Sequence, residues 1–187
     1  MKSITAIIII CLFLTGCGRK ETELVKIDIN KDGTFLVDGK SSNNAQLDKY
    51  ITDIAIEQGL DFKIFFIANA NTRYSVVEPI VLATVKTHVY LFNFQILGSS
   101  KSERCETGGG CRPPNTELSV EIKDNVIYID NIKKSISEVK ELFSSKPDKT
   151  IYYLVFISCS GETTFGTFYR FIELCNQSEY SCPVLKL

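Results

Sequence analysis

The stretch SVEIKDNVIYIDN, residues 119–131, is similar to an earlier part of the same chain, VKIDINKDGTFLVDG at residues 25–39. In both stretches apolar residues alternate with charged or polar ones, which is the period of a half-buried β-strand. Each stretch then breaks at a turn of Lys, Asp or Asn, resumes as a β-rich run, and closes on Asp-Gly or Asp-Asn. We therefore expect a β-hairpin at both places and one small fold that occurs twice.

The segments after the two hairpins also correspond. A helical spacing of apolar residues follows residue 43 and again follows residue 135. Continuous apolar runs at 62–68 and 151–158 then predict two central strands, and a second helix and a last strand follow each run. Sequences typical of a helix-capping box occur at 75–78 and 135–138.

We predict an α+β protein of two tandem β-β-α-β-α-β domains, at residues 24–97 and 117–187. Residues 98–116 are rich in Gly, Ser and Pro and have no apolar periodicity, so we expect a linker there. The alternative is a single α+β domain whose halves look alike only because strands and helices alternate.

Residues 1–16 have the features of a secretory signal. Lys2 precedes an apolar stretch of 11 residues, Ile4–Leu14, whereas a membrane-spanning helix needs roughly 20 residues. The segment runs into Leu-Thr-Gly-Cys, which resembles the bacterial lipobox, in which the Cys becomes the acylated first residue. We expect a lipid on Cys17 and a short tether over 17–23. A plain signal peptide or a buried N-terminal helix is the alternative.

The lipobox resemblance also implies a location. The protein would be anchored to a bacterial membrane and face the periplasm, and two or more acyl chains suffice for stable anchoring. Gly18, rather than Asp, follows the expected lipidated residue. By similarity to Gram-negative lipoproteins, this favours the outer membrane over retention in the inner membrane.

An exported chain meets an oxidising compartment, so its cysteines are candidates for disulfides. Five cysteines remain after the signal and the lipidated residue are set aside, and an odd number cannot all pair within one chain. Cys159 follows an apolar run and is expected to be a buried free thiol, although a pairing of Cys159 with Cys175 stays open. The predicted disulfides close two short loops, Cys105–Cys111 and Cys175–Cys182.

The first repeat resembles the periplasmic domain of the ExbD/TolR family of biopolymer-transport proteins. The similar features are the KDG turn, the DGK close, and the segments KIFFIANANTRY and YSVVEPIVLATV, within residues 24–96. The resemblance is weaker over 117–187. It implies a domain that binds partner proteins or the cell wall and that can dimerise, and a tandem copy could imitate that dimer. Family members also have a transmembrane helix with a proton-handling Asp, and the stretch Ile4–Leu14 has no acidic residue.

The sequence offers little for catalysis, and we expect no enzyme, no cofactor and no metal site. His88 is the only histidine, and a capping or surface role fits its place between a helix and a strand. The motif SCSG at 158–161 lacks the spacing of a nucleophile elbow, and TGGG at 107–110 lacks the Lys of a phosphate-binding loop. The net charge of −1 does not suggest a surface for nucleic acid.

These observations predict a lipid-anchored envelope protein that binds or scaffolds an envelope protein or peptidoglycan. Exposed strand edges would recruit a partner by strand addition. The alternative is a periplasmic immunity lipoprotein that neutralises a toxin, because a small protein with disulfides and no catalytic residues suits that role as well.

Overall fold

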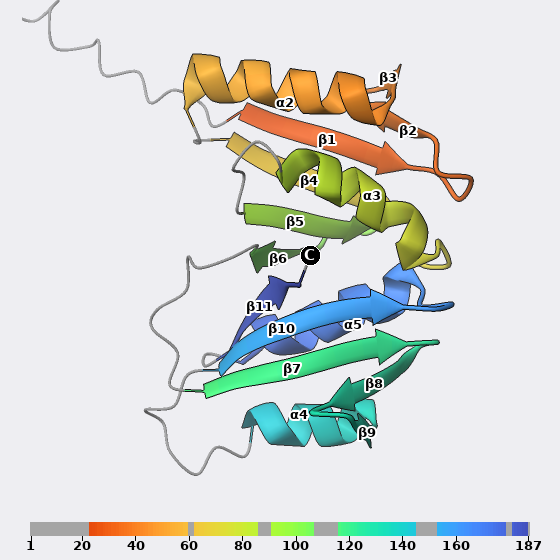
Figure 1. Ribbon diagram of the computed structural model, residues 1–187, viewed down its shortest axis with the longest axis vertical. Helices are drawn as coiled ribbons and strands as arrows, with labels where there is room; N and C mark the ends of the chain where they lie inside the picture. The colour runs from red at the N-terminus through yellow and green to blue at the C-terminus, as the bar shows by residue number, and fades with distance from the viewer. Residues whose placement is uncertain are drawn as a thin grey trace, which may run out of the picture.

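The computed structural model describes residues 23–59, 62–85, 91–106, 116–144, 153–178 and 181–186. The fold is α+β, and the same order of three strands, helix, strand, helix and strand occurs in both halves of the chain (Figure 1). Relative to the prediction, each hairpin gains one short third strand. The predicted lipidation site Cys17 lies outside the described residues.

The first half builds a mixed sheet from an antiparallel edge and a parallel centre. Strand β1 pairs antiparallel with β2 and parallel with β4, and β4 pairs parallel with β5. The elements are β1 (Glu23–Ile29), β2 (Phe35–Val37), β3 (Lys40–Ser42), α2 (Asn44–Gln58), β4 (Phe62–Ala68), α3 (Tyr74–Val85) and β5 (Leu91–Ile96).

The second half repeats these pairings. Strand β7 pairs antiparallel with β8 and parallel with β10, and β10 pairs parallel with β11. The elements are β7 (Thr116–Lys123), β8 (Val126–Ile129), β9 (Ile132–Lys134), α4 (Ile136–Ser144), β10 (Tyr153–Ser160), α5 (Phe165–Asn176) and β11 (Ser181–Leu185).

A strand that the sequence analysis did not anticipate joins the halves. Strand β6 (Ser102–Glu106) lies within the predicted linker, pairs antiparallel with β5, and meets β11 at Glu106 and Val184. The described strands thereby form one sheet in the order β3-β2-β1-β4-β5-β6-β11-β10-β7-β8-β9. Periodicity did not reveal β6 because one of its two buried positions is the charged Glu103, so the sequence SERCE shows no alternation of apolar residues.

The predicted hairpin turns form, with φ of 86° at Gly33 in the first half and of 52° and 64° at Asp124 and Asn125 in the second. A further turn leads into the third strand of each half, at Asp38 and Gly39 with φ of 47° and 78°, and at Asp130 and Asn131 with φ of 49° and 65°. Two consecutive positive φ angles are typical of the two-residue hairpin turn, in which Asp, Asn and Gly are favoured. The same turn chemistry therefore connects the second strand to the third in each half.

The helix starts agree with the sequence except at α3. Asn43 and Gln46 form a capping box before α2, and Ser135 and Glu138 form one before α4. Ser75 was predicted to cap the next helix of the first half, but α3 begins one residue earlier and contains Ser75. Local sequence could not show this start, because contacts with the second half fix it, as described below.

The helices of the two halves lie on different sides of the strands. Helices α2 and α3 lie in front of the strands of the first half, whereas α5 lies behind β10 (Figure 1). At the centre each half also packs on the other, since α3 contacts β10 and α5 contacts β5.

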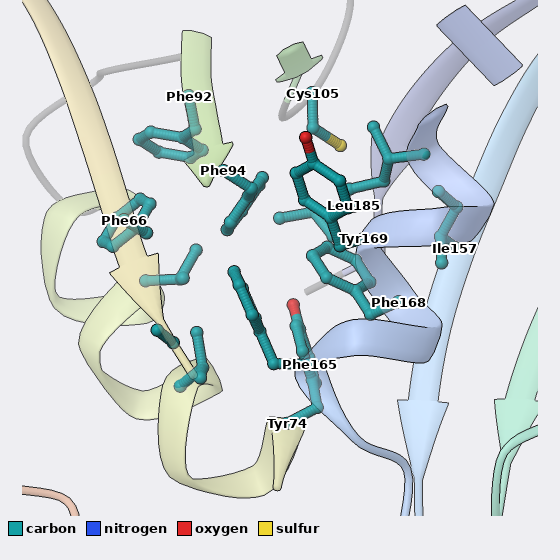
Figure 2. Packing of buried hydrophobic residues seen from close by; sticks show 14 of the residues in the cluster. Phe66, Tyr74, Phe92, Phe94, Cys105, Ile157, Phe165, Phe168, Tyr169 and Leu185 are labelled. Atoms are coloured by element: carbon teal, nitrogen blue, oxygen red, sulfur yellow. The ribbon is translucent and has the colours of Figure 1, made fainter. Parts of the chain in front are cut away.

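One hydrophobic cluster runs through both halves. At its centre Phe66 lies 5.4 Å from both Phe92 and Phe94, measured between ring centroids, and Phe94 lies 5.0 Å from Phe168 of α5 (Figure 2). Aromatic side chains bury more apolar area than any others, so this stack holds the halves together by the strongest available packing. The predicted apolar face of α5, comprising Phe165, Phe168, Ile172 and Cys175, is entirely buried.

Candidate functional site

The loops that follow β4 and β10 meet at the centre of the molecule and form what we call the junction, residues 69–73 and 161–164. Arg73 and Thr164 form an isolated antiparallel bridge there. The amide of Tyr74 donates to the carbonyl oxygen of Thr163 at 2.7 Å, and the amide of Phe165 donates to that of Thr72 at 2.6 Å.

These two hydrogen bonds are counterparts of each other. Tyr74 and Phe165 are the first residues of α3 and α5, and Thr72 and Thr163 each stand two residues before. Each half therefore gives the other the same bond that it receives, which is the contact pattern of a two-fold symmetric dimer. The bonds also satisfy an amide at the start of each helix, where no intrahelical partner exists.

The junction departs from symmetry at Gly166, the second residue of α5. Its amide donates to the carbonyl oxygen of Ala70 at 2.8 Å, and a Cβ at this position would lie 2.9 Å from that same oxygen. The position needs glycine because the backbones approach too closely for a side chain. Ser75 stands at the corresponding place in α3 and is exposed.

The two buried threonines of the junction also differ. The hydroxyl of Thr163 lies 2.8 Å from the carbonyl oxygen of Ile122 and 2.7 Å from that of Ser160, so it has acceptors within its own half. The hydroxyl of Thr72 is buried without a hydrogen-bond partner among the described residues. An unsatisfied buried hydroxyl costs stability, so the first half carries a local penalty that the second half avoids.

Aromatic side chains fill the space beneath the junction (Figure 2). The ring of Tyr74 lies 4.4 Å from that of Phe168, and Phe165 lies 6.1 Å from Phe94, so each contact joins one half to the other. Burial raises the pKa of Tyr74 well above its usual range. The tyrosine is therefore neutral at physiological pH and acts here as a core residue.

The cysteines lie around the same core. Burial raises the pKa of the Cys159 and Cys175 thiols, which disfavours the reactive thiolate. Cys175 is a buried free thiol, so the predicted bond from Cys175 to Cys182 is not formed in this structure. Cys159 is likewise a free thiol, half-buried at the end of β10. Cys105 also carries a thiol, so the predicted bond from Cys105 to Cys111 is not formed in this structure either, and Cys111 itself lies outside the described residues.

Cys105 lies on β6, the strand between the two halves. It is fully buried on β6, and its thiol donates to the carbonyl oxygen of Pro183 on β11 at 3.4 Å. The neighbouring Glu103 is also buried, accepting from the amide of Asn176 at 2.9 Å and pairing with Lys101 at 3.0 Å. These polar contacts position β6 between β5 and β11.

The sheet ends at two free edges. Among the described strands, β3 pairs with β2 alone and β9 pairs with β8 alone, so both end strands carry backbone groups that face away from this sheet. Strand β9 presents Ile132, which is 60% exposed, beside Lys133 and Lys134. Lysine on an edge strand discourages indiscriminate pairing with other chains.

A groove also lies between α2 and α3. It encloses about 680 Å³ and is lined by Ala45 and Asp48 of α2 and by Pro79, Leu82 and Ala83 of α3, among others. Its walls are mostly apolar, and Leu82 remains 39% exposed.

The remaining features bear on metals, membranes and known proteins. Within the described residues, no group of three or more His, Cys, Asp or Glu side chains is arranged to hold a metal ion. None of the described helices combines the length and apolar character that a membrane crossing requires.

Compared with known proteins, the chain matches no protein-family model, no curated protein and no solved structure.

Sequence reasoning missed the junction residues Thr72, Thr163 and Gly166. A usable signal existed for the threonines, because Thr72 and Thr163 stand at the same place in each repeat, two residues before a helix. No signal existed for Gly166, since only the approach of the Ala70 backbone from the other half makes glycine necessary.

Proposed function

We propose that this chain is a lipid-anchored binding or scaffold protein of the bacterial cell envelope, with two tandem domains similar to the ExbD/TolR periplasmic domain. The junction carries the proposal, because equivalent loops there exchange equivalent backbone hydrogen bonds. Domains that would otherwise pair as separate chains are joined covalently in this arrangement. Their pairing then becomes intramolecular and no longer depends on protein concentration.

A pair of domains joined in one chain suits a scaffold, because the two edge strands at the ends of the sheet are then held in a fixed orientation relative to each other. Strands β3 and β9 lie at opposite ends of the sheet, and each can accept an additional strand from a partner. The edge at β9 is the better candidate, since Ile132 offers an exposed apolar side chain beside the free backbone groups. A partner strand at β9 would gain both backbone hydrogen bonds and apolar contact.

The lipid on Cys17 would hold this platform at the membrane surface, facing the periplasm. The proton-coupled chemistry of the ExbD/TolR family is not part of the proposal. That chemistry needs an acidic residue within a membrane helix, and the apolar segment Ile4–Leu14 contains neither Asp nor Glu. The proposed role is therefore binding and positioning.

The test is recovery of partners from detergent-solubilised envelope with the full chain as bait. We compare wild type with Cys17→Ala, which removes the lipidation site, and with Ile132→Asp, which removes the apolar residue of the β9 edge. Ile56→Asp is the matched control, because Ile56 is an isoleucine that is 78% exposed on α2, in the half of the chain that does not contain β9. Metabolic labelling with an alkyne fatty acid shows independently whether Cys17 carries lipid.

We expect wild type and Ile56→Asp to recover an envelope protein or peptidoglycan fragments, and the other two variants to lose that recovery. Loss with Ile56→Asp as well would place the contact away from the β9 edge and contradict strand addition there. Recovery of a secreted toxin, equally with wild type and Cys17→Ala, would contradict the scaffold role and support the immunity alternative.

A further inference from the structure

The second half of the chain has a surface cavity at the starts of α4 and α5. It encloses about 340 Å³ and is lined by residues from the second hairpin and from both helices. This volume falls within the range of small-molecule sites, roughly 300–1,000 Å³. Its lining comprises Asn125, Val126, Ile127, Lys133, Lys134, Ser135, Ile136, Thr167 and Arg170.

The charged residues of this lining are all cationic. Lys133 and Lys134 come from β9 and Arg170 comes from α5, and no acidic residue belongs to the lining. Lys134 lies 3.6 Å from the carboxylate of Glu138, which neutralises part of its charge. Neither Lys133 nor Arg170 forms an ion pair with any residue that the structure describes.

The carboxylate of Glu138 is not part of the cavity lining. Its carboxylate accepts from both the amide and the hydroxyl of Ser135, each at 2.7 Å, and these bonds lower its pKa and hold it in the capping box. The carboxylate is therefore committed to the helix start. The cationic groups of β9 and α5 remain available to a ligand.

The helix starts beside the cavity already have partners. The starts of α4 and α5 both border the cavity, at Ser135 and Ile136 and at Thr167. Glu138 caps the start of α4, and the first amides of α5 donate to carbonyl oxygens of the first half. The three cationic side chains are therefore the groups that can attract an anion to this cavity.

The first half lacks these charges at the corresponding places. The hairpin pairings match Ser41 and Ser42 with Lys133 and Lys134, and counting from the helix starts matches Pro79 with Arg170. Three neutral residues thus correspond to three cationic ones. The shared fold does not require the cations, so we look for their role in binding.

We propose that this cavity binds a small molecule that carries a phosphate or a carboxylate group, with Arg170 and Lys133 as its main contacts. The planar guanidinium of Arg170 can donate two parallel hydrogen bonds to either group, and the ammonium of Lys133 adds a point charge. The inference does not depend on the proposed scaffold role, because it concerns a small ligand and not a partner strand.

The test is calorimetric titration of the full chain with inorganic phosphate and, separately, with acetate. We expect saturable binding of one of them, weakened about tenfold by Arg170→Gln or Lys133→Gln through loss of a charge-assisted contact. Lys140→Gln is the matched control, since Lys140 is an exposed cation on α4 outside the cavity lining. It makes the same change in net charge and should alter affinity by about twofold or less.

A preference for phosphate over acetate, or the reverse, identifies which chemical group the ligand carries. Absence of saturable binding with both ions would overturn the proposal. Equal weakening by Lys140→Gln would also overturn it, because the attraction would then come from the general charge of the surface. Unfolding curves of the variants, recorded in the same buffer, show that each is folded as the wild type is.

Discussion

The two halves of this chain share their turns and helix starts and differ in the surfaces beside them. Asp38-Gly39 and Asp130-Asn131 turn the second strand of each half into the third with two consecutive positive φ angles. Both first helices also begin with a capping box. The charged residues of the two hollows differ, since Asp48 lines the groove between α2 and α3, whereas Lys133, Lys134 and Arg170 line the cavity of the second half.

This difference indicates which residues determine the fold and which are free to change. Hairpin turns and helix caps satisfy backbone groups, so a repeat can keep them only by keeping residues of the same chemistry. Side chains on the outer face carry no such requirement. We therefore expect a substitution at the junction to affect the stability of both halves, whereas their surface residues can differ freely.

The largest effect is expected from Phe168→Ala. Phe168 is fully buried on α5, but its nearest ring contacts are with Tyr74 and Phe94 of the first half, at 4.4 and 5.0 Å, whereas Phe165 of its own half lies 6.2 Å away. Its loss should lower the free energy of unfolding by about 3–5 kcal/mol. Val77→Ala at the corresponding position of α3 should cost about 2 kcal/mol, since fewer methylene groups are removed.

Denaturant unfolding followed by circular dichroism measures both changes. Hydrogen exchange then shows where protection is lost. Phe168→Ala should reduce protection in β4 and β5 as well as in the second half. Loss confined to the second half would contradict the shared core.

The next effect is expected from Gly166→Ala. Alanine in a helix is usually more stable than glycine by about 1 kcal/mol. Here the added Cβ would lie 2.9 Å from the carbonyl oxygen of Ala70, so the junction must shift. We expect a net loss of about 1–2 kcal/mol in the free energy of unfolding.

Ser75→Ala is the control for Gly166→Ala, because Ser75 is the corresponding residue of α3 and is exposed. It should change stability by about 0.5 kcal/mol or less. A gain in stability with Gly166→Ala would mean that the two backbones do not approach as closely as the structure shows. The same chemical denaturation series serves both variants.

The junction also marks the limit of what the sequence could predict. Hairpins, central strands and the buried face of α5 follow from short-range periodicity, and their prediction was confirmed. The bridge between Arg73 and Thr164 joins residues 91 positions apart and leaves no local pattern. The start of α3 was misplaced for this reason, since the amide of Tyr74 is bound by the other half.

The candidate sites were still less visible in the sequence. Two consecutive lysines at 133 and 134 are typical of any solvated strand edge, and Arg170 lies 36 residues beyond Lys134. Only the folded chain brings these cations to one cavity. Strand β6 shows the same limit, because its sequence SERCE has no period and its partners belong to different halves.

A smaller effect is expected from the helix caps. Asn43→Ala and Ser135→Ala each remove the side chain that accepts from the amide three residues later. Each should cost about 1 kcal/mol. Similar losses in thermal or chemical unfolding would support equivalent roles in the two halves, whereas a loss in only one would show that one cap is dispensable.

The two capping boxes should differ in their response to acid. The third helical residue is the neutral Gln46 in α2 and the ionised Glu138 in α4. Hydrogen bonds from Ser135 lower the pKa of Glu138 in the folded state, so its contribution is present above the pKa of the unfolded chain, about 4.3. The contribution is lost as the pH falls through the lower folded pKa.

The measurement compares Glu138→Gln with Gln46→Ala at several pH values from 7 downwards. The stability difference between wild type and Glu138→Gln should shrink as the pH falls below 4.3, the approximate unfolded value. The difference for Gln46→Ala should stay constant over the same range, because the glutamine does not titrate. A pH-independent difference for Glu138→Gln would show that the carboxylate charge is not what stabilises the cap.

The smallest effect is expected from the ion pair that crosses the junction. Arg73 Nε lies 2.7 Å from the carboxylate of Glu162, but the two side chains are 62% and 63% exposed. Water screens such a pair, so a double-mutant cycle of Arg73→Ala and Glu162→Ala should give a coupling of about 0.5 kcal/mol or less. The coupling should vanish at 1 M salt, where the Debye length is about 3 Å. A coupling above about 1 kcal/mol would mean that charge holds the halves together, whereas the structure assigns that role to Phe168 and to the reciprocal backbone bonds beneath the pair.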